Sequence, residues 1–201
     1  MKRLCCIALL PLMTVSVWSQ SAPQGKPSAL PKRSGALVSS LYEQVVARHP
    51  LGIPYGADKK VFAPYLSKAL LHRFELNNGC FADWRRRNPD PSLKPPVGLI
   101  ENGLFSGGSE ESEPQAFHIE RTDPGKDGSS RVYVKLTWED PPNKPLTWYV
   151  AAVVVRENGH SVVDDVLYLK DKNGEVESRL SKDLSSGCDG ARWIGEGERP
   201  H

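Results

Sequence analysis

The chain has 201 residues, with 26 Lys and Arg against 24 Asp and Glu, and a formal net charge of +2. This length suits a single domain of ordinary size. The near-neutral balance gives no support to the binding of nucleic acid or of an anionic membrane surface, because both favour a strong basic excess.

The N-terminus predicts a secretory signal peptide over residues 1–19. A basic pair follows Met1 directly, an apolar stretch comes next, and the small residues Val17 and Ser19 place the cleavage before Gln20. The apolar stretch is shorter than the roughly 20 residues that a membrane-spanning helix needs. Removal of the signal takes away two basic residues and no acidic one, so the formal net charge falls to zero. We therefore expect a soluble, secreted or periplasmic protein.

Two of the four cysteines, Cys80 and Cys188, lie beyond the expected signal peptide. In an oxidising compartment they most simply form one disulfide, which stabilises a fold by about 3–5 kcal/mol in the loop-entropy model. A metal site on this pair lacks two further ligands at suitable spacing, and His72 with Glu75 lacks a third ligand. The sequence predicts a Cys80–Cys188 disulfide, no metal and no other cofactor.

Composition and periodicity predict two helices ahead of a long irregular segment. Apolar residues recur at helical spacing from Leu37 to Val46, and a second helix is predicted from Pro64, with a break at 77–79. The segment from Asn88 to Pro114 is too rich in proline and glycine for regular structure. Its centre nevertheless carries apolar residues, so we expect it to lie across an opening of the domain and to contact a ligand or partner. The residues concerned are Leu99, Ile100, Leu104 and Phe105.

The second half of the chain changes to a period of two. Alternating residues predict antiparallel strands around 117–120, 131–138, 146–156 and 161–169, the last two joined by the hairpin signal Asn158-Gly159. Val176, Leu180 and Leu184, spaced four apart, then predict a short helix. The expected fold is α+β, with N-terminal helices packed on a curved, cone-like, four-stranded antiparallel sheet and a short C-terminal helix. The expected division is a signal peptide at 1–19, a flexible linker at 20–35, one domain at 36–195 and a disordered tail at 196–201.

Adjacent aspartates interrupt the apolar strand at 161–169. Side chains alternate across a strand, so Asp164 and Asp165 are expected on opposite faces of the sheet, with one of them directed towards the helices. A carboxylate inside the domain must be hydrogen-bonded, or its pKa must rise.

The element order and the stretch GHSVVDDVLY at 159–168 resemble the nuclear transport factor 2-like superfamily of cone-shaped α+β domains. More narrowly, they resemble a bacterial envelope family of unknown function within it. The resemblance covers roughly residues 36–170, although a tryptophan expected near Ser161 is absent. It implies a pocket between sheet and helices. Some members of the superfamily are isomerases or dehydratases that use a pocket Asp, His or Tyr, whereas others only bind a ligand or partner.

Three hypotheses follow. The first is a non-enzymatic binding domain that holds a small apolar ligand or an envelope partner protein. The second is a cofactor-free lyase or isomerase with Asp164 or Asp165 as base and a nearby donor; the candidate donors are Tyr149, His72 and Tyr168. Against it stands a structural role, in which the inner aspartate holds a loop or helix end through backbone N–H groups. The third is a homodimer through the outer face of the sheet, suggested by the apolar residues on both faces of 161–169.

Overall fold

The computed structural model describes residues 29–93, 103–107, 113–139 and 141–195. The expected signal peptide, the first part of the linker, Leu99, Ile100 and the C-terminal tail lie outside these ranges. No helix within them is long and apolar enough to cross a lipid bilayer. The elements in chain order are α1 (Ala29–Arg48), α2 (Gly56–Phe62), the 3₁₀ turn η1 (Ala63–Tyr65), α3 (Lys68–Arg87), β1 (Ala116–Pro124), the 3₁₀ turn η2 (Lys126–Gly128), β2 (Ser130–Trp138), β3 (Leu146–Glu157), β4 (His160–Leu169), β5 (Val176–Arg179), α4 (Leu180–Asp183), β6 (Cys188–Asp189) and β7 (Arg192–Trp193).

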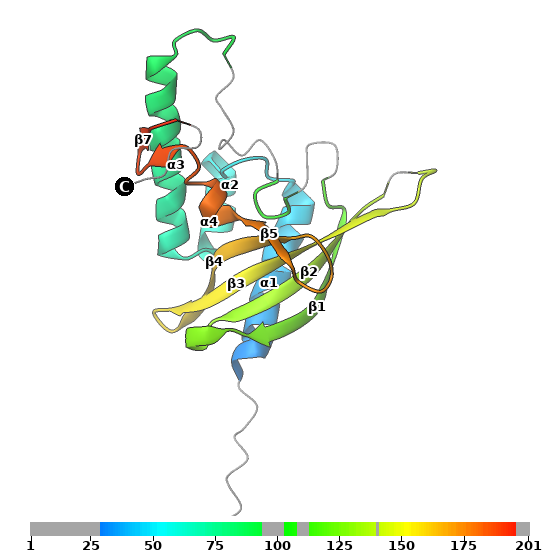
Figure 1. Ribbon diagram of the computed structural model, residues 1–201. Helices are drawn as coiled ribbons and strands as arrows, with labels where there is room; N and C mark the ends of the chain where they lie inside the picture. Colours follow the sequence, from blue (N-terminus) through cyan, green and yellow to red (C-terminus); the bar gives the residue numbers. More distant parts are fainter. Residues whose placement is uncertain (1–28, 94–102, 108–112, 140, 196–201) are drawn as a thin grey trace, which may run out of the picture.

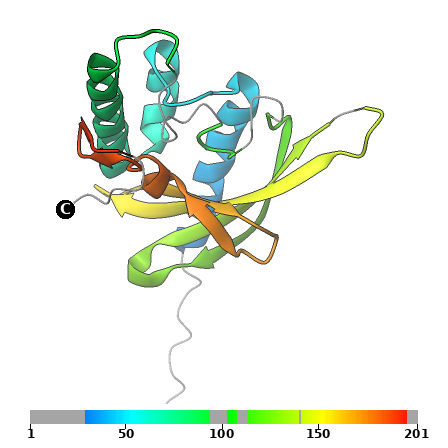
Figure 2. The same ribbon diagram turned by 45° about the horizontal axis from the view of Figure 1, so that its top comes forward.

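The fold has a helical layer on one face of an antiparallel sheet, as Figures 1 and 2 show. The sheet order is β1-β2-β3-β4-β5, so every strand pairs with its neighbour in the sequence. The predicted α+β class, with helices at the N-terminus and an antiparallel sheet, is confirmed. The predicted count of four strands is wrong, because a fifth strand extends the sheet.

The fifth strand occupies residues for which the spacing of Val176, Leu180 and Leu184 predicted a helix. Val176 pairs with Leu169 and Arg179 pairs with Leu167, so this backbone adds to the free edge of β4. Only the single turn Leu180–Asp183 is helical. A spacing of four cannot distinguish a two-turn helix from a strand that leads into one turn.

The helices differ from the predictions at their boundaries. α1 begins at Ala29, whereas the sequence predicted folded structure only from Gly35. α3 runs without interruption through 77–79, where a break was predicted. Asn77 is buried there and its Nδ2 donates to the Leu184 carbonyl at 2.8 Å. Gly79 lies so close to Ala191 that an added Cβ would stand 2.7 Å from the alanine Cβ. These tertiary contacts explain why α3 tolerates Asn77 and Gly79, two residues that weaken a helix.

The core lies between the helical layer and the inner face of the sheet. It unites side chains from α1, α2, α3, the inner faces of β2, β3 and β4, and the segment 103–107. Tyr42, Phe62 and Phe105 are the largest side chains that are completely buried in it.

Strands β2 and β3 continue beyond the helices as a projecting hairpin, clear of the body in both views (Figures 1 and 2). We call Trp138–Glu139 and residues 141–147 the hairpin arm. Trp138 pairs with Leu146 at its base, and all residues from 141 to 147 are exposed. The turn contains a cis peptide bond between Pro141 and Pro142.

Candidate functional site

The sequence predicted that this part of the chain lies across an opening of the domain. In the structure, the segment 103–107 instead fills the interior. Leu104 and Phe105 are both completely buried. The ring of Phe105 stacks on Phe62 of α2, with 5.1 Å between ring centroids. These two candidate ligand-contacting residues are therefore placed within the core in this structure.

Three aromatic donors hold the backbone of this inner segment. Tyr168 Oη donates to the Leu104 carbonyl at 2.8 Å and Tyr42 Oη to the Phe105 carbonyl at 2.7 Å. Trp148 Nε1 donates to the next carbonyl, that of Ser106, at 2.8 Å. Burial raises the pKa of Tyr42 and of Tyr168 well above the ordinary value, so both hydroxyls remain donors. These three donors of the interior thus form hydrogen bonds with backbone carbonyls of the same chain.

Asp165 is buried, with 2% of its surface exposed, and it holds the start of α4. Its carboxylate accepts from Ser181 N at 2.9 Å and from Ser181 Oγ at 2.7 Å. Arg179 Nε lies 2.7 Å from Oδ2 of the same carboxylate. These contacts are those of the structural role, because both oxygens accept bonds from the helix end and its flanking strand.

Asp164 lies at an irregularity of β4 that the sequence pattern did not predict. Val153 pairs with Asp165 and Val154 pairs with Val163, so Asp164 has no partner in the ladder and forms a bulge. The bulge changes the alternation, and Val163 and Val166 therefore both enter the core beneath the helices. Ser67 Oγ donates to Asp164 Oδ1 at 2.6 Å, which links β4 to the start of α3.

The structural role of Asp165 leads to a first prediction. Asp165→Ala lowers the free energy of unfolding by about 2–3 kcal/mol, because hydrogen bonds to a buried charge are lost. Asp164→Ala is the matched control and costs less than about 1 kcal/mol, because this residue is half-buried and makes one side-chain hydrogen bond of 2.6 Å to Ser67. Urea unfolding of both variants measures the difference; equal losses would contradict the assignment.

The other candidate catalytic residues lie on different elements and faces. Tyr149 packs with the cluster on the outer face of the sheet, whereas Tyr168 packs against the core on the inner face. His72 lies on α3 with 67% of its side chain exposed, and its Nδ1 is 3.8 Å from Glu75 Oε2. Within the described ranges no three His, Cys, Asp or Glu side chains gather as metal ligands. The structure does not assemble the candidates into one site.

An apolar groove lies on the outside, between the turn 51–54, α2, η1 and α3. Its volume is about 350 Å³, including space open to solvent. Phe62, Leu66 and Phe74 are buried side chains in its lining, while Lys59 and Glu75 are exposed. The full lining is Ile53, Pro54, Lys59, Phe62, Ala63, Leu66, Leu71, Phe74, Glu75 and Asn78. Sequence reasoning missed this groove, because the helical period marks these apolar residues as core but not which of them border solvent.

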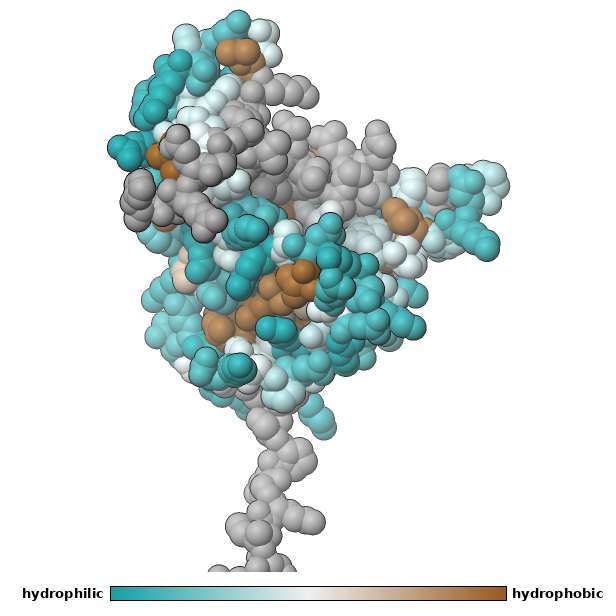
Figure 3. All heavy atoms as spheres, in the orientation of Figure 1, coloured by the Kyte–Doolittle hydropathy of each residue, from teal (hydrophilic) through white to brown (hydrophobic). Residues whose placement is uncertain are grey.

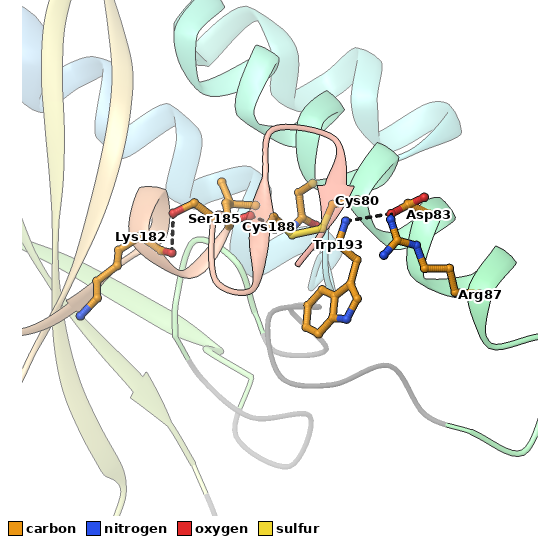
Figure 4. The surroundings of a disulfide bond; sticks show 9 residues. Cys80, Asp83, Arg87, Lys182, Ser185, Cys188 and Trp193 are labelled. Carbon is orange, nitrogen blue, oxygen red and sulfur yellow. Dashed lines mark hydrogen bonds and ion pairs between the residues drawn. A yellow bond between two sulfur atoms is a disulfide. The ribbon is translucent and has the colours of Figure 1, made fainter. Parts of the chain in front are cut away.

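The predicted disulfide between Cys80 and Cys188 is confirmed (Figure 4). It joins α3 to the small β6–β7 hairpin, and both cysteines are buried. Asp83, one turn further along α3, accepts from the backbone N–H of Trp193 at 3.0 Å. Arg86 and Arg87 contact the same carboxylate at 2.6 and 2.7 Å.

This contact makes the C-terminal hairpin sensitive to acid. The Trp193 N–H and the arginines Arg87 and Arg86 lower the pKa of Asp83 below its usual value. A lowered pKa contributes stability that is present above the unfolded-state pKa of about 4 and is lost as the pH falls through the lower folded-state value. We expect the Trp193 amide resonance to shift as the pH falls below about 4, and Asp83→Asn to abolish that shift. A shift unchanged in Asp83→Asn would contradict this origin.

Comparison of the chain with protein-family models, with curated proteins and with solved structures gave no match in any of the three.

Proposed function

We propose that this protein is a non-enzymatic binding domain whose groove between the turn 51–54, α2 and α3 holds an apolar group of a small ligand or of an envelope partner protein. One observation carries the proposal. The interior is filled by Leu104 and Phe105, and an apolar hollow remains on the outside. Apolar walls with a few polar groups are typical of binding sites.

The catalytic alternative has less support. A general base acts through an oxygen that can take up a proton from the substrate. Asp165 instead accepts bonds from Ser181 and Arg179, and Asp164 accepts from Ser67. A lyase or isomerase would also require space beside one of these carboxylates, and the groove lining includes neither.

The outer face of the sheet supports a homodimer as a second candidate. Tyr133, Ala151, Leu167 and Leu169 form a cluster there, bordered by Tyr149 and Val153. Figure 3 shows an apolar band on this face with hydrophilic residues around it. The four cluster residues are at most 8% exposed, so a second copy would contact mainly the partly buried Tyr149 and Val153 beside them. Sedimentation that shows a monomer at high concentration would exclude this candidate.

The proposed location is secreted or periplasmic, and the proposed relationship is to the nuclear transport factor 2-like superfamily with its curved, cone-like sheet. The disulfide supports an oxidising compartment. Helices followed by an antiparallel sheet, with strands joined at Asn158-Gly159, support the relationship. Bulges in β1 and β4 are of the kind that bends a sheet.

Native mass spectrometry of the mature protein purified from its own envelope tests the groove. We expect a bound species that is retained in Ala69→Phe and lost in Ala63→Phe. Ala63 lines the groove, whereas Ala69 is exposed on α3 outside it. Thermal unfolding establishes that both variants are folded. A bare wild-type protein, or a bound species that survives Ala63→Phe, would refute the groove as the binding site.

A further inference from the structure

We infer that Asn158, in the turn between β3 and β4, is a modification site whose side-chain amide is converted to a carboxylate by reaction with water alone. The chain has four Asn-Gly steps, at Asn78, Asn102, Asn158 and Asn173. Asn102 lies outside the described residues. The structure makes Asn158 the most reactive of the other three.

The reaction starts from the backbone nitrogen that follows the asparagine. This nitrogen gives its proton to solvent and attacks the side-chain carbonyl carbon, so that a C–N bond forms and the C–NH₂ bond breaks with release of ammonia. Water then opens the cyclic imide at either carbonyl and leaves aspartate or isoaspartate. A following glycine favours the attack, because it has no Cβ in the way and adopts a wide range of backbone angles. The reacting nitrogen and the asparagine amide must therefore both be free to move.

The turn at Asn158 leaves both groups free. β3 ends at Glu157 and β4 begins at His160, and the two loop residues between them are exposed. Their φ angles of 49° and 83° suit a two-residue hairpin turn. Apart from its neighbours in the chain, no described atom lies within 4 Å of the position that a Cβ of Gly159 would take. Within the described ranges, no hydrogen bond engages the Asn158 side chain or the Gly159 N–H.

Asn173 is also followed by glycine, but its reacting groups are held. Its Nδ2 donates to Asp171 Oδ2 at 2.8 Å. The reacting nitrogen, Gly174 N, donates to Asp171 Oδ1 at 3.1 Å and to the Asp171 carbonyl at 3.3 Å. Gly174 also lies so close to Tyr133 that an added Cβ would stand 2.9 Å from the ring. Attack at Asn173 requires these hydrogen bonds to break first.

The helix α3 protects the step at Asn78. This side chain is exposed, but the N–H of Gly79 lies within α3 and belongs to the helical hydrogen-bond ladder. Gly79 also packs against Ala191. Attack would require the middle of α3 to unwind. Asn158 is therefore the step of the three whose reacting groups are not held by hydrogen bonds.

The modification changes the contact of the hairpin with α3. Glu157, the neighbour of Asn158, accepts at Oε2 from the Lys68 backbone N–H at 3.1 Å, at the start of α3. Isoaspartate carries the main chain through an additional methylene, which lengthens the turn and disturbs the pairing of Glu157 with His160. The start of α3 thereby loses an acceptor.

Incubation of the mature, disulfide-bonded protein at mildly alkaline pH, followed over time by tryptic digestion and mass spectrometry, is the test. Trypsin places Asn78, Asn158 and Asn173 in different peptides, because basic residues lie between them. We expect the mass gain of an NH₂-to-OH exchange at Asn158, on the order of tenfold faster than at Asn173, because each hydrogen bond that must break raises the barrier. Asn158→Gln should abolish it, since the longer side chain closes a larger imide ring more slowly.

Asp171→Ala is the matched variant. It removes the carboxylate that holds Gly174 N and Asn173 Nδ2, so the rate at Asn173 should rise on the order of tenfold while the rate at Asn158 stays the same. An unmodified Asn158, or equal rates at Asn158 and Asn173 in the wild type, overturns the inference. An Asn173 that remains unreactive in Asp171→Ala overturns its explanation by hydrogen bonding.

Hydrogen exchange measures the effect on α3. After incubation, the Lys68 N–H of the wild type should exchange about fivefold faster than that of Asn158→Gln treated in the same way, as expected for the loss of one hydrogen bond. Equal exchange in a sample modified at Asn158 would refute the effect on α3.

Discussion

Phe105→Ala lowers the free energy of unfolding by about 4 kcal/mol, the loss typical of a large apolar side chain removed from a packed core. Phe105 is completely buried, its ring stacks on Phe62, and its carbonyl accepts from Tyr42 Oη. The substitution removes the ring and leaves the carbonyl, so the loss measures the packing of the interior. Urea unfolding monitored by circular dichroism gives the value.

Phe81→Ala is the control for this prediction. Phe81 lies on α3, is only half-buried, and contacts the guanidinium of Arg85. We expect a loss below about 1 kcal/mol there. Because Phe105→Ala leaves an apolar cavity, the variant should also bind a small aromatic probe such as benzene, as dry engineered cavities do. A loss below 1 kcal/mol without probe binding would show that the inner segment is not part of the core in solution.

Removal of the disulfide is the second change with a large expected effect. The bridge closes a loop with a sequence separation of 108 residues. The loop-entropy model gives about 4–5 kcal/mol for a loop of this size. We expect the double variant Cys80→Ala/Cys188→Ala to lose a similar amount, because the two alanines fit in the space of the buried thiols.

Reductant provides the control for the disulfide. It should destabilise the wild type to the level of the double variant and should leave the double variant itself unchanged. Unfolding curves in urea, with and without reductant, measure both. Equal stability of oxidised and reduced wild type would contradict a stabilising role for the bridge.

The sequence was informative where one residue type or one period decides the structure. Alternation predicted β2, β3 and the hairpin at Asn158-Gly159, and the number of cysteines beyond the signal predicted the Cys80–Cys188 bridge. Prediction from the sequence failed where contacts with a distant segment decide the local structure. Asn77 and Gly79 weaken a helix locally, yet α3 is continuous because Leu184 and Ala191 pack against it.

Dependence on distant segments also explains how much of the candidate site could be predicted. The apolar content of residues 97–108 correctly predicted that this segment is not freely solvated around Leu104 and Phe105. Its position inside the domain depends on Tyr42, Trp148 and Tyr168, which come from a helix and two strands far away in the sequence. The bulge at Asp164 could not be predicted from the sequence of β4 alone, because register is a property of two paired strands.

The attachment of β6–β7 to α3 has a consequence for the order in which the molecule is completed during synthesis. Asn77, Cys80 and Asp83 on α3 contact Leu184, Cys188 and Trp193, which a ribosome adds roughly a hundred residues later. A nascent chain that has not reached Leu184 has a helix with an amide, a thiol and a carboxylate that still lack these partners. Contacts of such long sequence separation also slow folding. The domain thus closes only once Trp193 has been added, so these contacts to α3 form late in its synthesis.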